Sequence, residues 1–112
     1  MGDIKESVFA IRPDSLLYRA NMSLTLENLQ KFVGGYIEVV TIGTFGNQEI
    51  LMICNEEGKL RDDCEPNFRL GNDIIMGDVV FAARDGQDIV GIAPTPITAF
   101  REWLKTRGVK YY

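Results

Sequence analysis

The stretch of residues 26–42, LENLQKFVGGYIEVVTI, constrains the fold of this chain more than any other, because it reads as a helix, a stop and a strand without interruption. Its first half places Leu26, Leu29 and Val33 at the spacing of one apolar helix face. Thr25 directly precedes this face and is suited to cap the helix N-terminus. The pattern predicts an amphipathic helix that packs on another element.

The pair Gly34-Gly35 ends this helix, and we expect Gly35 to take a positive φ, because glycine does so without a Cβ penalty. Residues 36–42 are β-branched and aromatic, with apolar side chains at positions of both alternating faces. We therefore expect an interior strand. Glu38 in its middle should either face solvent at a sheet edge or pair with an arginine, since an unpaired carboxylate is costly to bury.

The other segments predict a single α+β domain over residues 1–112, long enough to build a core without disulfides or metals. We expect further strands at residues 7–12, 16–20, 49–54, 79–84 and 89–92. A second helix should begin at Thr95 and Pro96, with threonine as the cap. The order ββαββ, loop, ββα indicates a mainly antiparallel sheet of about five or six strands with two helices.

Residues 59–72, KLRDDCEPNFRLGN, interrupt the apolar pattern, and we interpret them as a long surface loop. Within this loop, Asn67, Phe68 and Arg69 combine an amide, an aromatic ring and a guanidinium group. These groups can bind a base edge, stack on a base and hold a phosphate. The alternative is that Phe68 simply anchors the loop to the core.

Composition excludes several classes of function. The chain contains no histidine, which removes Ser-His and Cys-His nucleophile pairs and HExxH zinc sites, so we do not expect an enzyme. Its net charge of −4 argues against binding a nucleic-acid polymer. The acidic residues are not spaced as in known metal loops, and we expect neither a metal nor a cofactor. Cys54 and Cys64 should be reduced thiols.

No apolar run approaches the roughly 20 residues that span a membrane, and the N-terminal segment MGDIKES lacks the apolar core of a signal peptide. We therefore expect a soluble, cytoplasmic protein that does not bind membranes.

Four short motifs, in order and at similar spacing, resemble the phage and mobile-element proteins of the domain-of-unknown-function family 3846. They are LQKFVGGYIEVV at residues 29–40, NEEGKL at 55–60, Pro66-Asn67 and GDVV at 77–80. The resemblance covers roughly residues 8–83, and residues 61–65 depart from it. It implies a protein made in a bacterial host that acts by binding a host protein or a signalling nucleotide of host defence.

Two functional hypotheses follow. In the first, the protein binds or sequesters a small anionic, nucleotide-like ligand without catalysis, through Arg69, Phe68 and Asn67 with Lys59, Arg61 and Arg12 nearby. Because the chain is small, we expect such a pocket to form between the copies of a homo-oligomer. In the second hypothesis, the acidic loop of residues 56–65 docks on a basic surface of a host protein.

Three aromatic residues near the C-terminus are relevant to the expected homo-oligomer. Trp103, Tyr111 and Tyr112 either form an interface patch, since interface cores favour aromatic residues, or belong to a helix that closes one side of the sheet.

Overall fold

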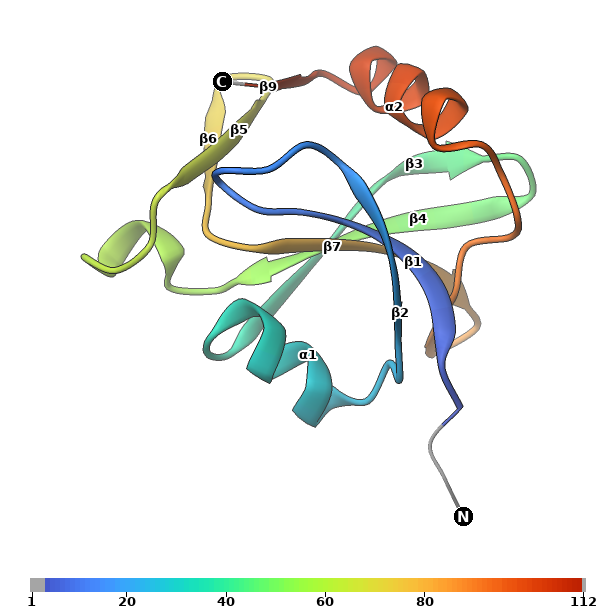
Figure 1. Ribbon diagram of the computed structural model, residues 1–112, viewed down its shortest axis with the longest axis horizontal. Coiled ribbons are helices and arrows are strands. Elements are labelled where there is room, and N and C mark those ends of the chain that lie inside the picture. Colours follow the sequence, from blue (N-terminus) through green and yellow to red (C-terminus); the bar gives the residue numbers. More distant parts are fainter. Residues whose placement is uncertain (1–3, 112) are drawn as a thin grey trace.

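A computed structural model describes residues 4–111 as strands β1 to β9, helices α1 and α2, and one 3-10 turn, η1 (Figure 1). In chain order the elements are β1 (Glu6–Ile11), β2 (Tyr18–Met22), α1 (Leu26–Val33), β3 (Ile37–Phe45), β4 (Gln48–Asn55), η1 (Gly58–Leu60), β5 (Pro66–Leu70), β6 (Asp73–Met76), β7 (Val79–Asp85), β8 (Asp88–Val90), α2 (Ile97–Thr106) and β9 (Val109–Tyr111). The predicted α+β class with two helices is confirmed. Tyr112 of the predicted aromatic patch lies outside the described residues.

The main sheet has six antiparallel strands in the order β2-β1-β7-β4-β3, with β8 paired to β7. Alternate residues of its central strands point to opposite faces, as the strand period of two requires. One face packs against Phe100 and Leu104 of α2, and the other against Leu29 of α1. The sheet therefore lies between the two helices, with α2 above it and α1 below it in Figure 1.

Both helices lie where the sequence predicts them, but the residues that end α1 and begin α2 differ from the prediction. The Thr25 hydroxyl accepts a hydrogen bond from the Asn28 amide at 3.1 Å, so the first cap is confirmed. The positive φ of 81° belongs to Gly34 and not to Gly35, because Gly34 itself is the C-cap. The predicted cap of α2 is wrong: Pro96 is the N-cap residue, and the Thr95 carbonyl accepts from Arg19 instead.

The prediction of an interior strand at residues 36–42 is wrong, because β3 is an edge strand. Among the described residues β3 pairs with β4 alone. Its apolar composition arises because both helices reach over it, with Ile37 on the α1 side and Val40 on the α2 side. Glu38 is exposed, which confirms the alternative that it faces solvent at a sheet edge.

The prediction of a surface loop over residues 59–72 is also wrong. The segment contains the end of η1 and all of β5, which joins β6 and β9 in a second, three-stranded sheet of order β6-β5-β9. Phe68 is 0% exposed in the core. The pattern was obscured because a register shift at Asn67 breaks the alternation and because β9 lies far along the chain.

No helix within residues 4–111 is long and apolar enough to cross a membrane.

Candidate functional site

The connection between β4 and β5 forms a corner of the molecule that we call the acidic corner, defined as residues 56–65. It leaves the sheet after Asn55, makes the single turn η1 and returns at Pro66. Surface hollows gather around it: four of them are lined by either Lys59 or Arg61. Several concave surface regions therefore border the acidic corner.

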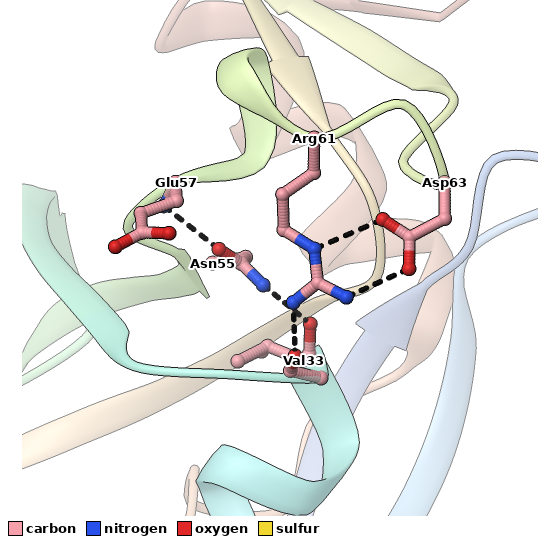
Figure 2. A network of polar contacts seen from close by, with 6 residues as sticks. Val33, Asn55, Glu57, Arg61 and Asp63 are labelled. Carbon is pink, nitrogen blue, oxygen red and sulfur yellow. Dashed lines mark hydrogen bonds and ion pairs between the residues drawn. The ribbon is translucent and has the colours of Figure 1, made fainter.

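A polar network holds the acidic corner against the end of α1 (Figure 2). Asn55, which is buried, donates from Nδ2 to the Val33 carbonyl oxygen at 3.0 Å and accepts the Glu57 amide on Oδ1 at 2.7 Å. Its two bonds therefore fix the helix end and the first turn of the corner together. Such satisfied buried amides specify one geometry, because leaving either group unpaired is costly.

Arg61 supplies the second half of this network. Its Nη1 donates to the carbonyl oxygen of Gly34, at the helix end that carries partial negative charge. Its Nε and Nη2 donate to the two carboxylate oxygens of Asp63 at 2.9 and 2.7 Å. This bidentate pair lowers the pKa of Asp63 below its usual value. The corner is therefore ordered by contacts that its own residues make.

The charge of the corner is predominantly negative. Five exposed carboxylates oppose two cations within residues 56–65: Glu56, Glu57, Asp62, Asp63 and Glu65 against Lys59 and Arg61. Both cations already pair with a carboxylate, Lys59 with Asp73 and Arg61 with Asp63. The surplus negative charge of this surface is therefore available to a cationic partner.

One hollow of about 240 Å³ lies between the corner and the turn that follows β1. Carboxylates enter it from three parts of the chain: Asp14, Asp63, Glu65 and Asp78, with Arg61 as the only cation among its lining residues. Burial raises the pKa of Asp78, while the nearby Arg12 opposes this shift. A hollow of this composition repels an anion and attracts a cation.

An apolar residue projects from the middle of this acidic surface. Leu60 is 85% exposed at the end of η1. Beside it, another hollow extends between the corner and β6, where Ile74 and Met76 contribute apolar side chains. A large exposed apolar side chain among charges is typical of a protein-binding surface.

The structure does not bring the predicted ligand residues together. Phe68 is buried against Phe81, with 6.1 Å between ring centroids, so it has no free face for a base. Asn67 is buried as well and donates from Nδ2 to the carbonyl oxygens of Ile11 and Gly77 at 2.9 and 2.7 Å. The alternative reading of Phe68 as a core anchor describes its place correctly.

The four predicted cations make their contacts in three different places. Lys59 and Arg61 belong to the acidic corner, whereas the Arg12 guanidinium lies over the Phe32 ring at 5.3 Å. Arg69 is exposed on the outer face of the second sheet, directly opposite Lys110 across the β5–β9 pairing.

Residues missed by the sequence analysis are Leu60, Asp14 and Asp78. The last two come from turns far from residues 56–65 in sequence, so no local pattern could have joined them to the corner. Within residues 4–111, no group of three or more histidine, cysteine or acidic side chains is arranged to hold a metal ion.

Fold and site together define a small α+β protein with an acidic, partly apolar surface corner. Comparison with protein families then gives its affiliation: the family model described as "Domain of unknown function (DUF3846)" matches residues 4–105, so this chain belongs to that family. Searches of curated proteins and of solved structures found no significant match.

Proposed function

We propose that this protein is a non-catalytic interaction module that docks its acidic corner on a basic surface of a protein partner. The single observation that carries the proposal is the combination of surplus exposed carboxylates with the exposed Leu60 on an internally ordered corner. The charges attract and orient a basic partner, and the leucine adds apolar contact once the surfaces meet. The resemblance to phage and mobile-element proteins suggests that the partner is a cytoplasmic protein of a bacterial host.

The order of the corner supports this role. Arg61 and Asn55 hold the backbone of residues 56–65 in place before any partner arrives. A surface that is ordered in advance loses less conformational freedom on binding than a disordered acidic tail does. The hollow lined by Asp14 and Asp78 offers a place for an arginine or lysine side chain of the partner.

The test uses two variants with the same change of net charge. The neutral-corner variant carries Glu56→Gln, Glu57→Gln, Asp62→Asn and Glu65→Gln, and it keeps Asp63 because that residue holds Arg61. The control variant carries Glu27→Gln, Asp85→Asn, Asp88→Asn and Glu102→Gln, at exposed positions outside the corner. Each protein is immobilised, bacterial proteins are captured at low and high salt, and each captured protein is then purified for kinetic measurement.

We expect the control variant to keep the partners of the wild type and the neutral-corner variant to lose them. For a purified partner, the association rate constant should fall by about one to three orders of magnitude in the neutral-corner variant, with a weaker dependence on salt. Leu60→Ser should instead raise the dissociation rate. If both charge variants capture the same proteins equally well, the corner is not the docking surface.

A second candidate function is binding of a small anionic ligand such as a signalling nucleotide. The observation that favours it is the adjacency of Arg69 and Lys110, which form no ion pair within residues 4–111. A thermal-shift screen with nucleotides and inorganic phosphate tests it, since ligand at 100 times its Kd stabilises a fold by roughly 2.7 kcal/mol. Arg69→Ala should remove the shift, and Lys5→Ala and the neutral-corner variant should retain it.

A further inference from the structure

The strands with a free edge in the two sheets differ greatly in length. Among the described residues, no strand pairs with the outer edge of β3, which is nine residues long. The other strands with a free edge are much shorter: β2 has five residues, β6 four, and β8 and β9 three each. A long free edge presents a row of backbone donors and acceptors to another strand, and proteins usually keep such edges short or charged.

Side chains on β3 do little to block pairing. Glu38 is the single charged residue among the nine of β3. Each shorter edge strand carries one charge among five residues or fewer, so charge is sparser along β3. The remaining positions are mostly β-branched, which favours strand pairing. Val39 is 38% exposed, and Tyr36 just before the strand is 68% exposed. These apolar side chains would lose contact with water if a second strand lay beside β3.

We propose that two copies of this chain pair through β3 as a two-fold symmetric, antiparallel dimer. An antiparallel contact between identical edges is closed, because the same patch serves both copies. The occupant we propose is a second copy, because the regular part of β3 can pair with itself so that Val39 of each copy is covered and the two Glu38 carboxylates are kept apart. Pairing joins the two main sheets into one continuous sheet.

The register follows from the irregularity and the charge of β3. Its pairing with β4 shifts between Thr41 and Gly43, so the regular part ends at Thr41. The regular stretch of residues 37–41 is symmetric about Val39, which then faces Val39 of the second copy. Glu38 falls opposite Val40 of the second copy. A register centred on Glu38 would place two carboxylates face to face, which is destabilising.

This dimer also has a consequence for recognition, which rests on the function proposed above. Tyr36 lines a hollow with Arg61 and Glu57, so the acidic corner lies beside the start of β3. In the Val39-centred register the two Tyr36 positions are six residues apart along the paired strands, about 20 Å at roughly 3.3 Å per residue. The two corners would therefore bind a partner with two basic sites more tightly than one corner does.

The first experiment measures the mass of the purified protein without any partner, so its outcome is independent of the docking proposal. Sedimentation equilibrium from micromolar to millimolar concentration should show a transition from one chain of 12.6 kDa to two. Val39→Lys, which sets two ammonium groups opposite each other, should shift the transition at least tenfold to higher concentration. Asn21→Lys, on the opposite edge strand β2, should leave it unchanged. A monomer at every concentration overturns the proposal, as does an unaltered dimer of Val39→Lys.

A second experiment keeps the proposal falsifiable if Val39→Lys fails to fold. In a Cys64→Ser background, Val39→Cys treated with a short bismaleimide should give a covalent dimer in high yield. Thr44→Cys, exposed on the same strand beyond the register shift, should remain monomeric. Equal cross-linking of both variants would overturn the Val39-centred pairing.

Discussion

Asn55 joins the end of α1 to the start of the acidic corner, because its Nδ2 donates to the Val33 carbonyl oxygen at 3.0 Å while its Oδ1 accepts from the Glu57 amide. The residue is buried, and so is its bond to Val33, whereas its bond to the Glu57 amide is partly buried. A single side chain thus couples the order of a helix to the order of the proposed docking surface.

We expect Asn55→Ala to lower the free energy of unfolding by about 1 to 3 kcal/mol, because it leaves a buried carbonyl and an amide without their partners. Urea denaturation followed by circular dichroism measures this loss. Asn21→Ala provides the control, since Asn21 is exposed on β2 and its side chain has no hydrogen bond within the described residues. Equal stability of the two variants would contradict the coupling described above.

Neighbouring residues of β5 should respond very differently to truncation. Phe68→Ala removes a fully buried ring and is expected to cost about 3 to 5 kcal/mol of stability, as large core truncations do. Arg69→Ala, one residue later on the exposed face, should change stability by no more than about 0.5 kcal/mol. Thermal unfolding of both variants checks this contrast, and a stable Phe68→Ala protein would refute the placement of Phe68 in the core.

The two thiols should differ in reactivity. Burial raises the pKa of Cys54 to about 11, and the Glu38 carboxylate beside it adds to the shift. The raised value means that the neutral thiol stabilises the fold below pH 9.0, and that this contribution is lost as the pH rises through about 11. Iodoacetamide at pH 8 should therefore label the native protein once, at Cys64, and the urea-unfolded protein twice. Two labels on the native protein would exclude a buried Cys54.

The Arg61–Asp63 pair should contribute to stability in a pH-dependent way. Hydrogen bonds from Arg61 lower the pKa of Asp63, so the stabilisation is present above the ordinary value of 3.8 and is lost as the pH falls through the folded-state value. The difference in melting temperature between the wild type and Asp63→Asn should accordingly be largest at neutral pH and shrink in acid. Asp62→Asn, at an exposed neighbouring position, is the control for the loss of one charge from the corner.

Glycine at position 34 should be needed for its backbone conformation alone. A Cβ atom there would meet nothing within 4 Å, but φ is +81°, so Gly34→Ala should cost about 1 to 2 kcal/mol. Gly34→Asn should be milder, because asparagine tolerates this conformation better. Melting temperatures of the two variants decide the point: identical values would indicate that backbone strain is not the cause.

Local patterns were sufficient to predict most of the main sheet and both helices. The helical spacing of Leu26, Leu29 and Val33 and the apolar runs of β4 and β7 are signals within a few residues of one another. Local patterns do not predict the order of the strands in the sheet, because a strand that is apolar on both faces can lie at an edge when helices cover it. For this reason β3 was expected inside the sheet.

The candidate site was predictable only in part. The density of charge in residues 56–65 identified the acidic corner from the sequence. Phe68 is predicted in a ligand site because its two neighbours, Asn67 and Arg69, carry polar groups. In the structure, the alternation of side chains in β5 turns Phe68 inward and Arg69 outward. Long-range pairing with β9 decides which of them is buried, and nothing near Phe68 in the sequence reports that pairing.

The three-stranded sheet sets an order in which the fold can be completed during translation. Phe68 pairs with Ile75 on one side and with Tyr111 on the other. A nascent chain that has emerged only as far as β7 can form the β5–β6 hairpin, but it has no strand to cover the second side. Until β9 leaves the ribosome, the second edge of β5 therefore has no partner strand, and at this stage chaperones or misfolding can compete with the native pairing.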